Sequence, residues 1–209
     1  MFMNISVLGP PGSGKGTQAK LVAAHFGLKH FSLGETLRAE IDKGSDLGRK
    51  TAEYVQEGKL VPEPLVLELF KSFSIQNRNA GLVLDGYPRT LGQAKALDEI
   101  LSLSCVVLFE VTEKQVLTRL SSRVIDLNGV PYNLETNPPP KGVEYKRRKD
   151  DRPEVVQARF REYVQEVEPI IEHYNQQGIL ASLDAEGTIG KIFDELLEKL
   201  AAVEKLNSQ

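Results

Sequence analysis

The stretch Gly9-Pro10-Pro11-Gly12-Ser13-Gly14-Lys15-Gly16-Thr17 follows a short apolar run at residues 5–8 and precedes a segment of helical periodicity. The spacing G-x-x-x-x-G-K between a strand and a helix is typical of a loop that binds nucleotide phosphates. Glycines let backbone N–H groups point inward, the following helix adds the positive end of its dipole, and Lys15 supplies a cation for the β- and γ-phosphates. Gly16 stands where such loops usually carry Ser or Thr, and the hydroxyl follows at Thr17, so a direct bond from Thr17 to Mg²⁺ is left open.

The composition favours one α/β core with inserted segments, because 209 residues are too few for two ordinary independent domains. The 26 Lys and Arg against 29 Asp and Glu give a formal net charge of −3, which argues against general binding to nucleic acid or to an anionic membrane. Cys105 is the one cysteine and lies in an apolar run, so neither an internal disulfide nor a Cys₄ zinc site is expected. No apolar stretch reaches the ~18 residues of a membrane span and the start has no signal-peptide pattern, so we expect a cytoplasmic protein.

Apolar runs recur at residues 5–8, 82–84, 106–109 and 179–183, with long segments of helical periodicity between them. This alternation predicts a buried parallel sheet with helices on both faces. Ligands of such sheets gather at the carboxyl ends of the strands, so the segments that begin at Gly9 and at Asp85 are expected at the same edge.

Two stretches interrupt the alternation. Residues 32–61 predict two short helices: Ser32 and Glu35 fit a capping box, Gly44 ends the first helix, and Gly58 closes a second one at about 46–57. These helices are too short and polar to form a core of their own, which indicates a small flap on the main sheet. Residues 124–151 are poor in apolar side chains and rich in Pro and Gly, which predicts a lid that moves relative to the core.

Charged side chains cluster around these features. Asp85 ends a strand beside the phosphate loop, where it is suited to holding Mg²⁺ or its water shell, although an aspartate before a glycine is also a common turn residue. Arg119 and Arg123, four residues apart, are expected on one face of a helix. Phosphoryl transfer needs two phosphate groups held in line, stabilised charge and excluded water, and guanidinium groups bind phosphate oxygens in pairs. The arginines predicted to surround one closable site are Arg38, Arg89, Arg119, Arg123, Arg148 and Arg159.

Six motifs spread over nearly the whole chain point to one family. Together they resemble adenylate kinases, nucleoside monophosphate kinases in which a glycine after the loop lysine is the usual form. The motifs are the loop at 9–17, Ser32-Leu33-Gly34-Glu35-Thr36-Leu37-Arg38, Gly58-Lys59-Leu60-Val61, Asp85-Gly86-Tyr87-Pro88-Arg89-Thr90, Gln93-Ala94 and Arg148-Lys149-Asp150-Asp151.

The resemblance implies a three-layer α/β fold like that of P-loop nucleoside triphosphate hydrolases, with helices on both faces of a parallel five-stranded sheet. It implies a core of residues 1–31, 62–123 and 160–209, an NMP-binding flap at 32–61 and a lid at 124–159. It further implies a cytoplasmic monomer that reversibly transfers the terminal phosphoryl group of ATP to AMP, giving two ADP. Mg²⁺ would be held by the nucleotide and by water molecules, and Asp85 would contact the ion through such a water. No zinc is expected.

The resemblance also assigns site residues. Those that steady the transferring phosphoryl group are Lys15, Arg89, Arg123, Arg148 and Arg159. The ATP-binding residues are Gly12, Ser13, Gly14, Lys15, Gly16, Thr17, Arg119, Arg123, Pro131 and Tyr132. The AMP-binding residues are Leu33, Arg38, Lys59, Leu60, Val61, Gly86, Tyr87, Pro88, Arg89, Gln93, Arg148 and Arg159.

Two positions depart from the family pattern. Leu33 replaces the usual Thr beside the acceptor base, and Glu35 replaces the usual Asp after Gly34. The leucine lacks a hydroxyl that could help select adenine, which leaves a UMP/CMP kinase as an alternative within the class. From another class, a nucleotide switch that slowly hydrolyses ATP or GTP is a further alternative, although a switch needs no second phosphate site.

Overall fold

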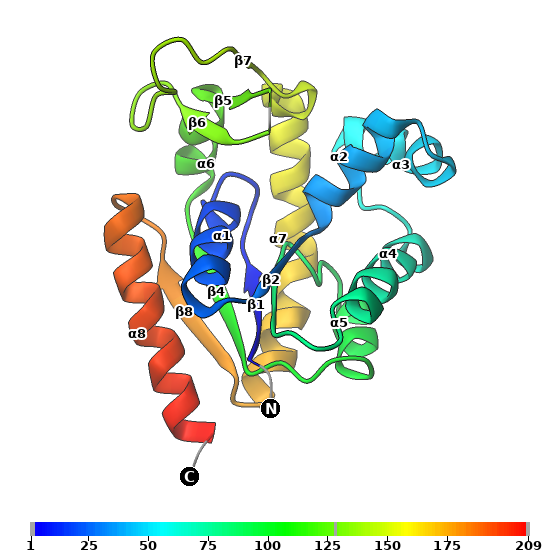
Figure 1. The fold of residues 1–209 in the computed structure, drawn as a ribbon, viewed down its shortest axis with the longest axis vertical. Coiled ribbons are helices and arrows are strands. Elements are labelled where there is room, and N and C mark those ends of the chain that lie inside the picture. The colour runs from blue at the N-terminus through cyan, green and yellow to red at the C-terminus, as the bar shows by residue number, and fades with distance from the viewer. Residues whose placement is uncertain (1–2, 128, 208–209) are drawn as a thin grey trace.

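The computed structural model describes residues 3–127 and 129–207. Its centre is a sheet of five parallel strands in the order β2-β3-β1-β4-β8 (Figure 1). This confirms the α/β class and the five-stranded parallel sheet. The strands are β1 (Asn4–Leu8), β2 (Lys29–Ser32), β3 (Leu82–Asp85), β4 (Cys105–Glu110) and β8 (Leu180–Asp184).

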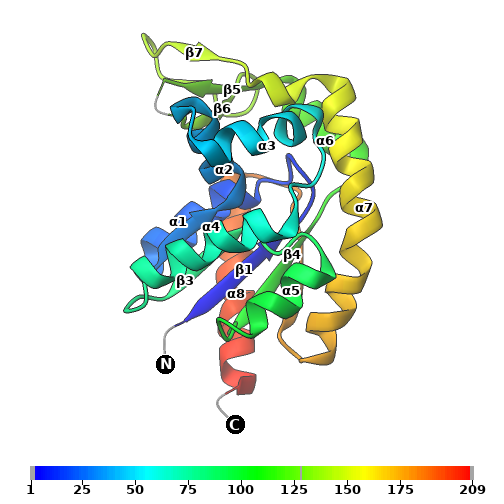
Figure 2. The ribbon, with the colours of Figure 1, turned by 90° about the vertical axis from the view of Figure 1, so that its right-hand side faces the viewer.

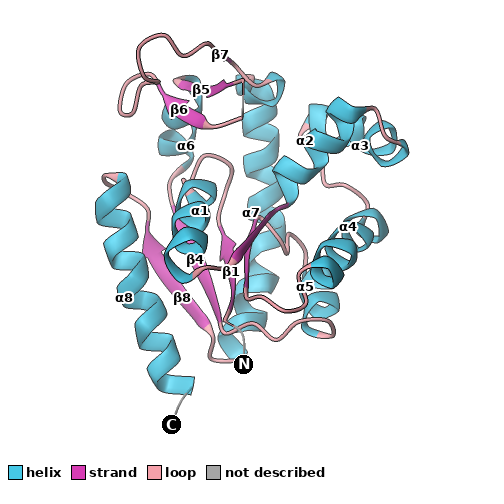
Figure 3. Ribbon diagram, viewed as in Figure 1, coloured by secondary structure: helices cyan, strands magenta, loops and turns pink. Residues whose placement is uncertain are grey.

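Helices cover both faces of the sheet, as Figures 2 and 3 show. Because side chains alternate along a strand, Val83 packs with α1 and α8 on one face, whereas Leu82 and Leu84 pack with α4 and α5 on the other. Farther along that second face, Leu8 and Leu108 pack against α5 and α7. The helices are α1 (Lys15–Phe26), α4 (Glu63–Gln76), α5 (Leu91–Asp98), α6 (Glu113–Ser121), α7 (Pro153–Gln176) and α8 (Ile189–Asn207).

The segment at 32–61 forms the two predicted helices, α2 (Leu33–Lys43) and α3 (Asp46–Glu57). Ser32 accepts the Glu35 backbone N–H as the N-cap of α2, and glycines in the left-handed conformation end both helices. The Glu35 side chain does not complete the capping box, because it pairs with Lys20 of α1 at 2.7 Å. The apolar side of this flap joins the same buried cluster as β2, β3 and α4, through Leu37 and Val61.

The segment after α6 contains a three-stranded antiparallel sheet, which the sequence patterns did not predict. Its strands are β5 (Arg123–Asp126), β6 (Pro131–Asn133) and β7 (Tyr145–Lys146), and a 3₁₀ turn at Lys149–Asp151 leads into α7. Residue 128 of this lid lies outside the described residues. The prediction that Arg119 and Arg123 share a helix face is wrong, because α6 ends at Ser121 and Arg123 begins β5.

Strand β2 is the one strand of the main sheet that the apolar runs did not indicate. The strand begins with the polar residues Lys29 and His30, so it contains no apolar run. Only Phe31 and Ser32 are buried, because β2 lies at the edge of the sheet. Across the described chain, no helix has both the length and the apolar composition needed to cross a membrane.

Candidate active site

The phosphate loop connects β1 to α1 at the carboxyl edge of the sheet. Gly14 is the N-cap of α1 with φ of 91°, a left-handed conformation that favours glycine. Lys15 Nζ donates to the Pro10 carbonyl at 3.1 Å, so the ammonium group folds back over its own loop. The amino end of α1 and this lysine together concentrate positive charge at the loop.

The glycine at position 16 has a steric reason. A Cβ placed on Gly16 would lie 2.9 Å from Asp85 Oδ2, closer than ordinary contact allows. That carboxylate is buried, and its Oδ2 accepts a hydrogen bond from Ser32 Oγ at 2.9 Å. The usual Ser or Thr after the loop lysine is therefore excluded here by the close approach of Asp85 to α1.

The larger of two cavities at this edge has a volume of about 750 Å³ and lies between the phosphate loop and the lid. Its volume is in the range of about 300–1,000 Å³ that small-molecule sites occupy. Asp85 lines it, as do Arg148 and the segment 187–190 that follows β8. All residues predicted to bind ATP line it: Gly12, Ser13, Gly14, Lys15, Gly16, Thr17, Arg119, Arg123, Pro131 and Tyr132.

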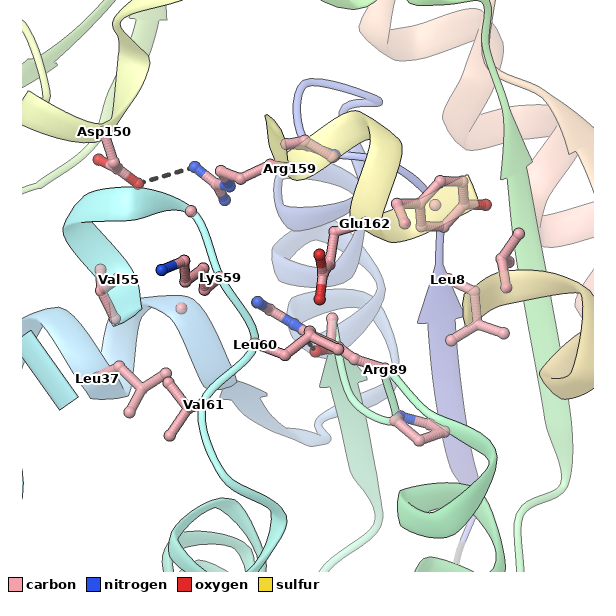
Figure 4. A pocket seen from close by; sticks show the side chains of 18 of the residues that line it. Leu8, Leu37, Val55, Lys59, Leu60, Val61, Arg89, Asp150, Arg159 and Glu162 are labelled. Atoms are coloured by element: carbon pink, nitrogen blue, oxygen red, sulfur yellow. Dashed lines mark hydrogen bonds and ion pairs between the residues drawn. The ribbon is translucent and has the colours of Figure 1, made fainter. Parts of the chain in front are cut away.

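The smaller cavity has a volume of about 100 Å³ and lies under the flap. The predicted AMP-binding residues that line it come from the flap, from the loop after β3 and, in the case of Arg159, from α7 (Figure 4). Apolar side chains that were not among the predicted site residues, such as Leu37, Val55 and Ile170, line it as well. The predicted residues are Arg38, Lys59, Leu60, Val61, Gly86, Pro88, Arg89 and Arg159.

The two cavities meet at a shared cationic wall. Lys15 from α1, Arg38 from the flap, Arg89 after β3 and Arg159 from α7 line both cavities. Four segments that are far apart in the chain therefore bring positive charge to one place. Two ligands whose anionic ends point at this wall would have those ends next to each other.

Two lid-side carboxylates occupy arginines of this region. Asp150 Oδ2 accepts from Arg159 Nη1 at 2.9 Å and lies 3.6 Å from Arg38 Nη1, while Asp151 Oδ2 accepts from Arg123 Nε at 2.8 Å. Burial by itself would raise the pKa of the Asp150 carboxyl, but Arg159 and Arg38, helped by two further arginines, hold that pKa below its usual value. Asp150 therefore stays ionised and offsets the charge of the wall.

Burial also changes the pKa values of the cationic side chains. It lowers the pKa of Lys15 to about 8, an effect that Asp85 opposes and neighbouring arginines reinforce. The pKa of Arg89 falls to about 10, mainly through burial and then through Arg159. Near neutral pH the arginine remains fully charged, whereas Lys15 approaches its titration range.

Three predicted AMP-binding residues line neither cavity. Leu33 and Tyr87 are fully buried in the cluster under the flap, and Gln93 is 3% exposed. Gln93 Oε1 accepts the Arg89 backbone N–H at 2.8 Å, so this amide holds the Arg89 loop. Arg148 lines the larger cavity but not the smaller one.

Arg119 makes contacts that the sequence did not foresee. Its guanidinium donates to the Ser13 carbonyl at 3.1 Å and to the Ala185 carbonyl at 2.5 Å, so it fastens the phosphate loop to the segment after β8. Gln18 Nε2 donates to the Ile189 carbonyl at 2.9 Å in the same region. The segment 187–190 comes after the carboxyl end of a parallel strand. Because ligands of such sheets bind at that edge, this position in the sequence could have predicted the segment as part of the site.

Comparison with known proteins agrees with this architecture. A family model described as Adenylate kinase matches residues 7–179. Proteins named Adenylate kinase are similar over nearly the full length. One from Thermosipho melanesiensis is 42% identical over 209 residues, covering 93% of this chain and 98% of the relative. One from Archaeoglobus fulgidus is 40% identical over 215 residues (95% and 99%), and one from Methanothrix thermoacetophila is 38% identical over 212 residues (95% and 99%).

The chain belongs to the adenylate kinase family. The resemblance seen in the sequence motifs is thereby confirmed, and the chain is a nucleoside monophosphate kinase, a phosphotransferase. Membership of the adenylate kinase family does not favour the UMP/CMP kinase or the switch. Within the described residues, no group of three or more His, Cys, Asp or Glu side chains could hold a metal ion, so this adenylate kinase family member has no zinc-type cluster there.

Proposed function

We propose that this adenylate kinase family member transfers the terminal phosphoryl group of ATP to AMP, with ATP in the larger cavity and AMP in the smaller one. The shared cationic wall is the observation that carries this proposal, because it gives two nucleotides adjoining phosphate ends. The reverse reaction uses two ADP in the same cavities.

The residues of the wall stabilise charge that spreads over the oxygens of the transferring group. Lys15 binds the donor phosphates, Arg38 and Arg89 bind the AMP phosphate, and Arg159 faces both. Arg123 and Arg148 approach from the lid side of the larger cavity, while Arg119 holds the loop beside the donor base. Gln93 acts through the loop of Arg89, and Leu33 shapes the acceptor slot from behind, through the apolar cluster it shares with Leu37.

Mg²⁺ is the cofactor that the proposal requires, and the residues of the larger cavity are compatible with it. Asp85 is an ionisable group at the loop, close enough to the backbone of α1 to exclude a side chain at position 16. Without a cluster of ligands in the described chain, the ion would be held by nucleotide phosphates and water, with Asp85 accepting hydrogen bonds from that water. When bound, Mg²⁺ supplies further neutralisation of phosphate charge.

The division into a core (1–31, 62–123 and 160–209), a flap (32–61) and a lid (124–159) accounts for how the nucleotides enter and how water leaves. A volume of about 100 Å³ is too small for a nucleotide by the usual range of binding sites, so the flap moves outward to admit AMP. Closure of the flap and lid then excludes water, which would otherwise compete with AMP for the phosphoryl group.

Steady-state rates with AMP, GMP, UMP, CMP and dAMP as acceptors test the proposal in a coupled assay with ATP and Mg²⁺. The highest kcat/KM is expected with AMP. A higher value with UMP or CMP would identify a UMP/CMP kinase instead. Hydrolysis of ATP at the same rate with and without acceptor, and no transfer to any monophosphate, would identify a switch.

A further inference from the structure

Glu162 is one of two acidic side chains in a cavity that is lined mainly by cations and apolar groups. It lies on α7 and lines the smaller cavity, and Figure 4 shows its carboxylate pointing into that cavity. The other lining carboxylate, Asp150, is paired with Arg159 and Arg38. In the described part of the chain, neither an ion pair nor a hydrogen bond engages Glu162. An unpaired carboxylate beside a phosphate site repels the phosphate unless it binds another group of the ligand.

The cavity-lining face of α7 changes its chemistry in a regular order. Arg159, Glu162, Tyr163, Val167 and Ile170 line the cavity, and their spacing puts them on one helix face. Arg159 is at the cationic wall, Glu162 lies about 4.5 Å farther along the helix axis, and Ile170 about 12 Å beyond that. The face therefore runs from a cation through a carboxylate to apolar side chains.

A nucleoside monophosphate has the same order of chemistry. Its phosphate is anionic, its ribose carries hydroxyl donors, and its base has broad apolar faces. With the phosphate at the wall of Arg89 and Arg159, as in the proposed function, the sugar comes next along α7. A carboxylate accepts hydrogen bonds from hydroxyl groups, and bonds to an ionised acceptor are stronger than those between neutral groups.

We infer that the Glu162 carboxylate accepts a hydrogen bond from a ribose hydroxyl of the acceptor nucleotide and thereby selects acceptors that carry this hydroxyl over those that lack it. This inference rests on the proposed function, which puts a nucleoside monophosphate in this cavity. Glu162 is a specificity residue in this account and takes no part in the transfer of the phosphoryl group.

Lys59 offers a competing use for the carboxylate. It lines the same cavity from the flap, but its ammonium group pairs with Glu57 at 2.6 Å and remains 66% exposed. A Glu162–Lys59 pair would act on flap position and would therefore affect every acceptor equally. The ribose contact, in contrast, affects only acceptors that carry the hydroxyl.

The test compares AMP, 2′-deoxy-AMP and 3′-deoxy-AMP as acceptors for the wild type, Glu162→Ala and Glu162→Gln, with saturating ATP and Mg²⁺. Glu162→Ala is expected to lower kcat/KM for AMP by about 10- to 100-fold. It should lower the value by about twofold or less for the analogue that lacks the contacted hydroxyl. Glu162→Gln keeps an acceptor oxygen without the charge, so its loss with AMP should be intermediate.

The matched control is Glu168→Gln, an exposed carboxylate on the same helix that lines neither cavity, and it should leave all three values unchanged. Equal losses with all three acceptors, or no loss with AMP, would overturn the inference. If the wild type transferred no phosphoryl group to AMP, the proposed function would fail separately. Calorimetric binding of the same three monophosphates would then compare the variants directly, with the same pattern expected.

Discussion

At the scale of single residues, the low pKa of Lys15 makes the reaction sensitive to pH. Burial brings that pKa from 10.5 to about 8, and only the protonated form attracts phosphate. We expect kcat/KM for ATP to fall as the pH rises above about 8, approaching tenfold per pH unit. Arg89 cannot cause this decline because its pKa is about 10. The decline should be absent from the residual activity of Lys15→Met, and a decline that persists in this variant would assign it to another group.

The same shift has a consequence for the stability of the free protein. Since the folded-state pKa of Lys15 lies below the unfolded value, the folded protein binds fewer protons than the unfolded chain between about pH 8 and 10.5. The contribution of Lys15 to the free energy of unfolding therefore rises with pH in this window. The difference in free energy of unfolding between wild type and Lys15→Met, measured by urea denaturation from pH 7.5 to 10, should move in favour of the wild type.

Gly16 gives a second prediction at this scale. In Gly16→Ala the new methyl group meets Asp85 Oδ2, which Ser32 holds in place, so we expect the free energy of unfolding to fall by about 1–3 kcal/mol. The double variant Gly16→Ala/Asp85→Ala lacks the carboxylate that the new methyl group would meet. Its loss in free energy of unfolding should therefore be smaller than the sum of the losses of the two single variants. The control is Gly190→Ala, which meets no atom within 4 Å and should change stability by about 0.5 kcal/mol or less. Strict additivity in urea denaturation would contradict the steric account.

A site residue could be predicted where the local sequence is enough to indicate its role. This holds for the loop around Lys15 and for the arginines, because their spacing and side chains are typical of phosphate binding. It does not hold for Asp150: that residue follows four consecutive cations and nothing local indicates its partners, and only the fold brings Arg38 from the flap to within 3.6 Å of it. The resemblance to adenylate kinases put Leu33 beside the acceptor base, whereas its side chain packs in the core beneath the flap.

At the scale of elements, Asp150 connects three segments: the 3₁₀ turn of the lid, α2 of the flap and α7. Its carboxylate lies where phosphate oxygens would meet the same arginines. Asp150→Asn should therefore lower the free energy of unfolding of the free protein by about 1–3 kcal/mol, since it leaves two arginines without their counter-ion. With saturating ADP and Mg²⁺ the difference from wild type should narrow, because phosphate replaces the carboxylate.

Thermal unfolding with and without ADP and Mg²⁺ measures this effect. Glu195→Gln is the control, because it removes an exposed ion pair with Lys191 on α8, neither residue lines a cavity, and the change should cost about 0.5 kcal/mol or less in both conditions. A deficit of Asp150→Asn that is the same in both conditions would show that the carboxylate does not stand in for phosphate.

The helices and strands could be predicted where their burial requires a regular pattern of apolar residues in the sequence. The four apolar strands and both flap helices follow from apolar runs and caps such as Ser32. The edge strand β2 and the lid sheet did not follow, since each buries few side chains: Val124 and Asp126 are the buried residues of β5, and β6 and β7 have none. Their strands are specified by pairing with neighbours that only the fold supplies.

At the scale of the whole molecule, the shared wall predicts how a single ligand that fills both cavities would bind. Two adenosines joined through a polyphosphate chain need at least the four phosphates that ATP and AMP carry between them. Because the second end binds within the same molecule as the first, we expect such a compound to bind about 10²- to 10⁴-fold more tightly than ADP. It should raise the melting temperature far more than ADP at equal concentration.

A series of dinucleotides with two to six phosphates, measured by thermal unfolding and calorimetry, tests this arrangement. Chains with two or three phosphates are shorter than the four phosphates that ATP and AMP carry between them, so we expect these compounds to bind no more tightly than ADP. The stoichiometry should change from two ADP to one dinucleotide per chain. Arg89→Ala should remove most of the advantage of the longer compounds, since it removes charge where the two phosphate groups meet. If the two-phosphate compound bound as tightly as the longest one, the two cavities would not be the two ends of a single reaction site.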